Sequence, residues 1–308
     1  MIFNFFNITR IPLNYKTDNY TFPPKLSYQW IITKEIHINN NWSASEALYD
    51  FITGSGTFDD PYILENITIT NRRDGSDGII VQNSMDYFII RNCRLKSSGT
   101  LLNNSEVKLV NSTRGILINN TISSNVGYGI SLINSYNNSI IENSMFNNTY
   151  IGIGLNKSHN NVIIYNRANN HGKDVKQGFG IVLFNSDNNS ISKNIASYNT
   201  AIGILLYNSS FNNITLNTAN NNYLGLHLGQ SSNYNNIIGN NLKGNNYCYT
   251  VDTEAEGNIF EDNDCGSVGF EFYFFLIAFG SVFALSLIGA IFAIRRRRKI
   301  KKERKKYK

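Results

Sequence analysis

Three stretches of similar sequence begin at Tyr136, His159 and Asp187: YNNSIIEN (136–143), HNNVIIYN (159–166) and DNNSISKN (187–194). They share the frame Asn-x-Ile-x-x-Asn, which recurs as NNITLN from Asn212 and NNIIGN from Asn235. Degenerate copies start at Asn66, Tyr87, Gly115 and Asn258, and five of the eight steps between the nine starts are 23 residues long. A period this regular indicates a solenoid.

A second frame, Gly-Ile-x-Leu, follows each start by about 14 residues, as in GISL at Gly129 and GIVL at Gly180. Residues two apart, such as Ile130 and Leu132, point to one face of a β-strand. A third apolar column lies seven residues after each start. The high Asn content and the spacing of two disfavour amphipathic helices, so each unit is predicted to hold two or three short strands.

Such units bury their apolar faces only by stacking as successive coils of a parallel β-helix. Asn tolerates the left-handed conformation of tight turns, and its amide can bond to the coil above or below. The second Asn of the motif is therefore predicted to form a structural ladder that runs through Asn71, Asn92, Asn120, Asn143, Asn166, Asn194, Asn217, Asn240 and Asn263. The repeated motif is interpreted as architecture, since it lacks a nucleophile and a consistent acid or metal ligand.

With these motifs, the chain resembles the right-handed parallel β-helix repeat family, which includes NosD-like accessory factors and carbohydrate-binding or sugar-hydrolysing β-helices. The resemblance covers roughly Ile36 to Cys265. It implies an all-β solenoid of about nine coils. Ser43 and Glu46 could form a capping box for a short helix around residues 44–51, which would cover the open end of the stack.

A second region is predicted after the solenoid. Residues 272–294, FYFFLIAFGSVFALSLIGAIFAI, carry no charge over 23 positions and are long enough to cross a bilayer as one helix. The basic tail 295–308 follows and should stay cytoplasmic, which places the solenoid (36–265) and the poorly defined segment 1–35 outside the cell. Residues 1–10 lack a typical signal peptide, so the route of export stays open.

The charge distribution argues against nucleic acid as a partner. The tail 295–308 holds 11 Lys or Arg and one Glu, whereas the other 294 residues hold 17 basic and 21 acidic groups. The net charge of +6 therefore comes from the tail alone, and the solenoid has no basic footprint for a phosphate backbone.

Catalysis by stacked carboxylates requires acidic residues at one offset in successive coils, and no such column occurs. The richest acidic cluster is Asp59 and Asp60 with Asp74 and Asp77. It is interpreted mainly as turn sequence, with a calcium or catalytic site as the alternative; no other cofactor is predicted. Copper, which a NosD-like chain would bind, needs gathered soft or imidazole ligands, but the four His fall at unrelated offsets.

Of the three Cys, Cys248 falls in the second-frame Gly column and Cys265 in the third apolar column. Their side chains are expected to diverge, although an exported chain favours a disulfide between them. Cys93 is expected to be a buried thiol. Asn-x-Ser/Thr sequons recur along the solenoid and would be glycosylated if the source modifies them.

Two 28-residue steps mark insertions at equal offsets, near Ser97 and near His171. Tyr128, Tyr150, Tyr223 and Tyr247 precede the second frame and could form an aromatic row along the same edge. Because exposed aromatic rows stack on sugars and loops on rigid scaffolds often carry recognition, the predicted ligand-binding residues are Tyr150, His171, Lys173, Asp174 and Lys176.

The sequence therefore predicts a single-pass membrane protein whose extracellular β-helix binds or presents a ligand at the cell surface without catalysis. A glycan or cell-surface polymer is the expected partner. Two alternatives stay open: a polysaccharide lyase or glycoside hydrolase, and a NosD-like copper maturation factor.

Overall fold

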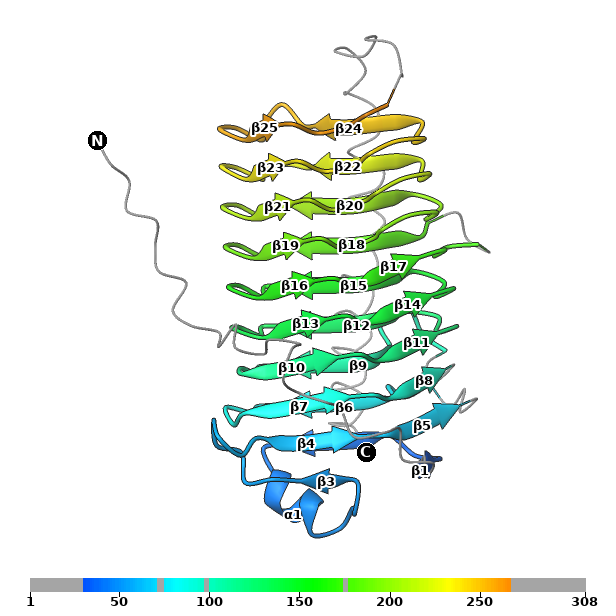
Figure 1. The fold of residues 1–308 in the computed structure, drawn as a ribbon, viewed down its shortest axis with the longest axis vertical. Coiled ribbons are helices and arrows are strands. Elements are labelled where there is room, and N and C mark those ends of the chain that lie inside the picture. The colour runs from blue at the N-terminus through cyan, green and yellow to red at the C-terminus, as the bar shows by residue number, and fades with distance from the viewer. Residues whose placement is uncertain (1–29, 71–74, 97–99, 174–176, 267–308) are drawn as a thin grey trace, which may run out of the picture.

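The computed structural model describes residues 30–70, 75–96, 100–173 and 177–266. These residues form a right-handed β-solenoid of about eight turns with almost no helix (Figure 1). Each complete turn contributes a short strand or bridge to each of three sheets, in which successive turns pair in parallel. The predicted all-β solenoid is confirmed, and the nine repeat starts delimit eight full turns rather than nine.

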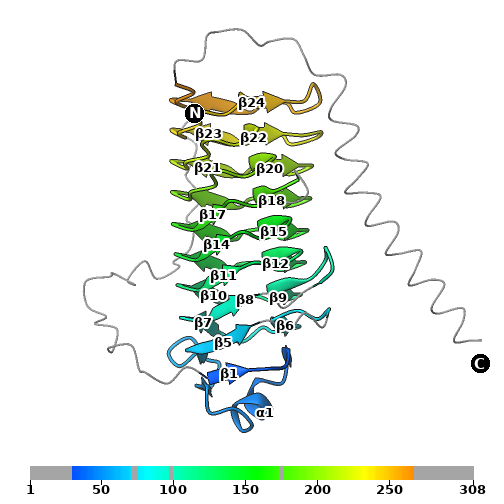
Figure 2. The same cartoon turned by 90° about the vertical axis from the view of Figure 1, so that its right-hand side faces the viewer.

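Sheets B and C run the length of the stack, as a view turned by 90° shows, whereas isolated bridges continue sheet A in the last turns (Figure 2). Sheet A contains β1 (Trp30–Ile32), β5 (Ile67–Thr70), β8 (Arg94–Lys96), β11 (Thr121–Ser123), β14 (Ser144–Phe146) and β17 (Arg167–Asn169). Sheet B contains β2 (Ile36–Asn39), β6 (Ile79–Gln82), β9 (Ser105–Val110), β12 (Tyr128–Ile133), β15 (Ile151–Asn156), β18 (Phe179–Phe184), β20 (Ile202–Tyr207), β22 (Leu224–Leu228) and β24 (Tyr247–Val251). Sheet C contains β3 (Ile52–Thr53), β4 (Tyr62–Glu65), β7 (Phe88–Arg91), β10 (Gly115–Ile118), β13 (Ser139–Ile141), β16 (Val162–Ile164), β19 (Ser190–Ser192), β21 (Asn213–Thr215), β23 (Asn236–Ile238) and β25 (Ile259–Glu261).

The core is built from side chains that stack in columns. Ile130 of β12 pairs with Ile153 of β15, and Leu132 pairs with Leu155, so like residues lie above one another. All four are at most 1% exposed. The spacing of two in the Gly-Ile-x-Leu frame thus places both aliphatic residues inside, as predicted. Every turn buries its apolar face only against its neighbours.

The first two repeat starts were predicted out of register. Tyr62 pairs with Phe88, and Phe88 pairs with Gly115, so the first parallel strand of sheet C is β4 and not the strand after Asn66. Asn66 and Asn92 consequently have left-handed backbones at the turn, with φ of 57° and 54°. The ladder position itself is taken by Cys93, whose backbone N–H donates to Oδ1 of Asn120 at 2.9 Å. Asn71 lies outside the described residues.

From Asn120 onwards, the second Asn of each motif forms a continuous internal ladder. Each Oδ1 accepts a backbone N–H from the preceding turn at 2.9–3.0 Å, through Asn120, Asn143, Asn166, Asn194, Asn217, Asn240 and Asn263. Each Nδ2 donates to a sheet C carbonyl of the turn before, as Asn166 does to Ile140 at 2.7 Å. A side chain with one acceptor and two donors thus satisfies buried turn groups that no strand can reach.

Two more internal ladders flank the turn between sheets B and C. One uses the first Asn of the motif, in Asn138, Asn161, Asn189, Asn212, Asn235 and Asn258. The other uses hydroxyl groups, in Ser112, Ser135, Ser158, Ser186, Ser209 and Ser232. The turn is therefore bonded to its neighbours on both sides, which makes it rigid.

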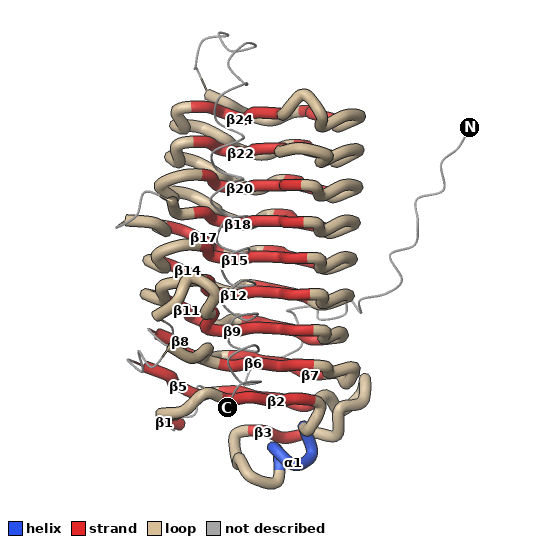
Figure 3. The backbone as a smooth tube through the Cα atoms, turned by 180° about the vertical axis from the view of Figure 1, so that it is seen from behind, coloured by secondary structure: helices blue, strands red, loops and turns tan. Residues whose placement is uncertain are grey.

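The N-terminal end is closed by α1 (Trp42–Glu46), visible in blue in the view from behind (Figure 3). Trp42 is 1% exposed and donates from its indole nitrogen to Ser84 Oγ at 2.9 Å. A covering helix is present, but it begins two residues earlier than the predicted 44–51 and ends at Glu46, and the predicted capping box is not formed. Asn41 occupies the N-cap position, and the Ser43 hydroxyl instead contacts the Tyr62 hydroxyl at 2.8 Å.

The last turn carries the disulfide Cys248–Cys265, with a Cα–Cα distance of 5.5 Å. The expected divergence of the two side chains was wrong because the second-frame Gly column faces inwards. A Cβ placed on Gly152 would lie 2.7 Å from the Cβ of Ala168, in the third apolar column. Glycine is required wherever these columns meet, and in the last turn a Cys pair fills both positions. Cys93 is buried as a free thiol, as expected.

No helix in the described ranges is long and apolar enough to span a bilayer. The predicted membrane helix 272–294 and the basic tail 295–308 lie outside those residues.

Candidate functional site

The predicted ligand-binding edge is largely covered. Tyr150 is only partly exposed, because its ring packs edge-on against Phe179 at 5.7 Å and against Tyr128 at 6.4 Å. Burial raises the pKa of Tyr150 above its ordinary value. Lys173 is exposed, whereas Asp174 and Lys176 lie outside the described residues. The predicted aromatic row is present as two pairs, Tyr128 with Tyr150 and Tyr223 with Tyr247. Tyr128, Tyr150 and Tyr247 pack against an apolar cluster on the outside of sheet B.

The prediction placed His171 on an exposed insertion, and this placement was wrong. His171 is 0% exposed and occupies a position that Asn fills in other turns. Its ring Nδ1 accepts the backbone N–H of Asn148 at 3.1 Å, and the backbone N–H of His171 donates to Asn199 Oδ1 at 3.1 Å. Burial lowers the pKa of His171 to about 3. His171 is therefore a variant rung of an internal ladder and cannot touch a ligand at the surface.

The predicted acidic cluster is not assembled by the described residues. Asp59 and Asp60 are exposed in the turn before β4. Asp77 is buried, with Oδ2 2.6 Å from Lys108 Nζ and Oδ1 accepting the Ser105 N–H. Asp74 lies outside the described ranges, and within those ranges no three His, Cys, Asp or Glu residues are grouped to hold a metal ion.

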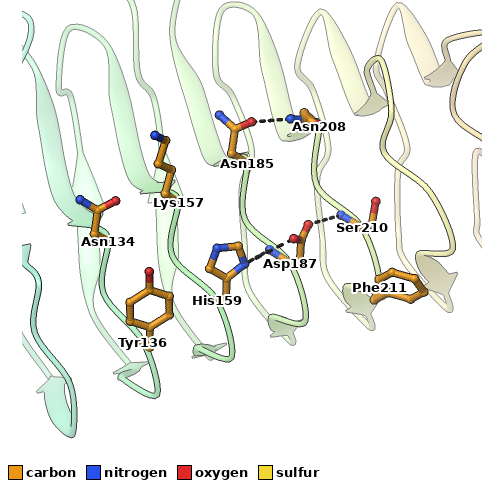
Figure 4. Close-up of a pocket in the computed structure, with 9 residues that line it drawn as sticks. All are labelled: Asn134, Tyr136, Lys157, His159, Asn185, Asp187, Asn208, Ser210 and Phe211. Carbon is orange, nitrogen blue, oxygen red and sulfur yellow. Dashed lines mark hydrogen bonds and ion pairs between the residues drawn. The ribbon is translucent and has the colours of Figure 1, made fainter.

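A polar groove lies instead along the turns between sheets B and C (Figure 4). It has a volume of about 530 Å³ and crosses four successive turns. Its lining residues are Asn134, Tyr136, Lys157, His159, Asn185, Asp187, Asn208, Ser210 and Phe211. None of these was predicted as a binding residue.

Local backbone geometry explains which side chains reach the groove. In the turn 134–138, Asn134 and Asn137 are left-handed, with φ of 49° and 54°. Ser135, which follows Asn134, and Asn138, which follows Asn137, point inwards as ladder rungs. This pattern leaves the central residue, Tyr136, pointing outwards. His159, Asp187 and Ser210 hold the same central position in the next three turns, so a variable row is displayed on a fixed frame.

The central row forms a ladder of its own, directed opposite to the internal ones. The Asp187 N–H donates to His159 Nδ1 at 2.9 Å, and the Ser210 N–H donates to Asp187 Oδ1 at 2.7 Å. His159 Nδ1 also lies 3.5 Å from Asp187 Oδ2. Since Nδ1 accepts a backbone proton, neutral His159 carries its own proton on Nε2. That N–H and one carboxylate oxygen of Asp187 are available to a ligand.

Two aromatic stacks flank the groove. The Tyr136 and His159 rings are stacked at 5.5 Å and 8°. The Phe211 and Tyr234 rings are stacked at 5.4 Å and 11°, and Phe211 is 58% exposed. In each pair the two rings lie nearly parallel on successive turns, and the lining residues His159 and Phe211 belong to the turns before and after the one that holds Asp187.

The groove contains few fixed charges. Lys157 is exposed, and no ion pair involves it in the part of the chain that the structure describes. Asp187 is the single carboxylate among the lining residues. Aromatic faces, amides and a few charged groups on a concave surface are typical of a site for a polar organic ligand.

A signal for this groove was present in the sequence. The three stretches that reveal the repeat begin with Tyr136, His159 and Asp187, and these first letters differ while the Asn pair after them does not. A position that varies beside structural rungs is where a solenoid can carry recognition.

Comparisons with known proteins agree with the fold. The family model described as "Right handed beta helix region" matches residues 29–177, and that of the "Periplasmic copper-binding protein (NosD)" matches residues 169–268. No curated protein matches the chain.

Two solved structures illustrate the resemblance. A variant of the periplasmic alginate epimerase AlgG has 18% sequence identity and a TM-score of 0.56, covering 66% of this chain and 50% of its own. The A-module of the Azotobacter vinelandii mannuronan C-5 epimerase AlgE4 has 13% identity and a TM-score of 0.53, covering 68% of this chain and 71% of its own. The chain thus spans half of the AlgG structure, and at these identities the likeness concerns the fold. The two family models and the solenoid together support a place for this chain among right-handed β-helix proteins.

Proposed function

We propose that this protein binds a polysaccharide in the groove between sheets B and C and does not alter it. The observation that carries the proposal is a row of hydrogen-bonding side chains, Asp187 among them, between two aromatic pairs on the neighbouring turns. Sugar rings bind proteins through aromatic stacking on their apolar faces and hydrogen bonds from their hydroxyl groups. The structurally similar alginate and mannuronan epimerases support a polysaccharide as the ligand class.

A binding role without catalysis is supported by the carboxylates. Glycoside hydrolysis generally requires two carboxyl groups flanking the scissile bond. The groove lining supplies Asp187 alone, and one of its oxygens already accepts the Ser210 N–H. The groove is therefore equipped to hold a sugar more clearly than to cleave one.

A polysaccharide array probed with the full chain tests the proposal. We expect binding to at least one polysaccharide, and that polysaccharide should be recovered with unchanged length and composition after prolonged incubation. Binding to no polysaccharide would contradict the binding role. Recovery of shortened or chemically altered chains would contradict its non-catalytic nature and favour the alternative of a lyase or hydrolase.

The copper-binding alternative rests on the NosD family model. Copper sites gather imidazole, thiolate or thioether ligands. In the described ranges, His159 and His227 each lie beside a single carboxylate, and His171 is sealed inside the solenoid. No group of three metal-binding side chains is present there. These residues do not fit a copper site.

Presentation at the cell surface is a further part of the proposal. It rests on the apolar sequence 272–294 and the basic sequence 295–308, which would anchor the chain with the solenoid outside. Protease added to intact cells should then remove the solenoid and spare the tail. Protection of the solenoid would contradict this orientation.

A further inference from the structure

The groove contains one turn that differs from those on either side of it. The turn 134–138 carries Tyr136, the next carries His159, and the fourth carries Phe211. The third turn has no aromatic side chain in the groove and presents Asp187 (Figure 4). Two turns separate His159 from Phe211, which is about 10 Å along the axis at about 4.8 Å per turn.

The turn that holds Asp187 places a carboxylate side chain between two turns that carry the aromatic residues His159 and Phe211 (Figure 4). A sugar over this turn would meet Asp187 with its hydroxyl groups and the aromatic residues at its two ends. The distance from one turn to the next is also close to the advance of one pyranose unit in an extended, equatorially linked chain. A polymer lying along the solenoid axis would therefore place about one sugar on each turn.

Asp187 determines the charge that this site accepts. Its Oδ1 is held by the Ser210 N–H at 2.7 Å, and Oδ2 lies 3.5 Å from His159 Nδ1. A carboxylate can only accept hydrogen bonds, so it favours sugar hydroxyl groups and repels a second carboxylate. Lys157, the fixed cation of the groove, belongs to the preceding turn and to a different position within it.

We infer that the site above Asp187 holds a neutral sugar through its hydroxyl groups and rejects a uronate. This inference rests on the proposed polysaccharide binding and narrows it. The ligand is then a polymer with neutral residues at least at one position in its repeat, in contrast to the wholly anionic alginate on which the structurally similar epimerases act. Asp187 is assigned as the specificity-determining residue.

The chain supplies its own matched controls for Asp187. Two turns further on, Asn233 holds the same central position, and its Oδ1 accepts the Glu256 N–H at 2.7 Å. Asp187→Asn thus keeps the acceptor for Ser210 and removes only the charge. In the intervening turn, Ser210 Oγ accepts the Asn233 N–H at 3.0 Å, so Asp187→Ser is a second substitution that the position tolerates.

Isothermal titration calorimetry on the full chain tests the inference. The probes are neutral hexasaccharides of glucose, mannose, galactose and N-acetylglucosamine. Each is compared with a hexasaccharide of the same linkage whose sugars are oxidised to uronates at C6. We expect the neutral form of a binding hexasaccharide to bind at least about tenfold more tightly than its oxidised form. Asp187→Asn and Asp187→Ser should bring this ratio close to one, while thermal unfolding shows both variants to be folded.

Oxidised forms that bind the parent as tightly as neutral ones, or a ratio that neither substitution changes, would overturn the assignment of Asp187 and leave polysaccharide binding standing. If no hexasaccharide and no arrayed polysaccharide binds, the proposed function fails, and this inference fails with it.

Discussion

Asn161 and His159 lie two residues apart in the same turn but belong to two different kinds of ladder. Asn161 points inwards, accepts the Asn138 N–H at 2.9 Å and is 0% exposed. His159 points outwards, accepts the Asp187 N–H at 2.9 Å and remains partly exposed. The two bonds have similar geometry, yet the inner position is Asn in six successive turns and the outer position is occupied by Tyr, His, Asp, Ser, Asn and Glu.

The reason for the difference is solvent. An inner rung has no water to replace a lost partner, so its side chain must satisfy every buried group it meets. An outer rung can exchange its bond with water at little cost. The inner ladders therefore fix the turn, and the outer row is free to vary with the ligand. The comparison teaches that the repeated residues define the scaffold, whereas the variable residues line the candidate site.

The largest expected effect concerns the last turn, where the inner ladders reach their final rungs. The disulfide Cys248–Cys265 spans 17 residues of sequence there. Replacing both Cys with Ser should lower the free energy of unfolding by about 3 kcal/mol, because the bridge restricts the unfolded chain. Urea denaturation of the oxidised parent and the double variant measures this. An unchanged midpoint and slope would show that the inner columns close the stack without the bridge.

The inner and outer rungs can be compared directly by one substitution. Asn161→Leu should lower the free energy of unfolding by about 2 kcal/mol, since it strands the Asn138 N–H and two carbonyl groups in the interior. His159→Leu should change it by less than about 0.5 kcal/mol, because water can replace the exposed bond. Denaturant unfolding of both variants gives the difference. Equal losses would break the distinction between the two ladders.

At His171, an inner rung leaves buried polar groups without hydrogen bonds. Its Nε2 and the Asn148 Nδ2 are buried without a hydrogen-bond partner. His171→Asn, which restores the residue of the neighbouring turns, should raise the free energy of unfolding by about 1 kcal/mol at neutral pH. A decrease would mean that the turn has adapted to the imidazole.

The same variant has a pH signature. The pKa of His171 is lowered from 6.5 to about 3 by burial, so below pH 6.5 the unfolded chain binds a proton that the folded chain does not. The contribution of His171 to stability is therefore lost as the pH falls from 6.5 towards 3. The parent should lose stability over this range more steeply than His171→Asn. Parallel curves in a pH series of thermal unfolding would contradict the buried, neutral state.

The fold could be predicted from the sequence because its determinants are local and repeated. The 23-residue step, the Ile and Leu two apart and the recurring Asn each satisfy the same physical demand in every turn. The register failed where the repeat was degenerate: Cys93 takes the ladder position, and Asn66 was assigned to the wrong strand. Sequence spacing alone could not reveal that the Gly column faces inwards, since Gly has no side chain to show its direction.

The site was harder to predict because recognition has no period. The insertion near His171 attracted the prediction through its length and charge, but an imidazole can replace an Asn as a rung, and only packing reveals this. Tyr150 was predicted as exposed, yet Phe179 from the next turn covers it. The groove arises from a row that aligns only after stacking, and the stacking of Phe211 on Tyr234 joins residues 23 positions apart.

The central claim, that recognition lies on the turn between sheets B and C, can be tested with two matched aromatic residues. Phe211 lies on the turn between sheets B and C, whereas Tyr198 lies on a turn between sheets A and B. They are 58% and 59% exposed and have φ of 58° and 60°. Asn, which suits a left-handed backbone and already occurs at position 188 in the Phe211 column, can replace both with equal strain.

Affinity for the polysaccharide identified on the array should be measured by calorimetry for the full chain and for each variant. Phe211→Asn should weaken binding by about 1 kcal/mol, or roughly fivefold, because it removes a stacking face from the groove. Tyr198→Asn should leave the affinity unchanged. Equal affinities for the parent and Phe211→Asn, or a loss confined to Tyr198→Asn, would contradict the assignment of the groove as the binding site.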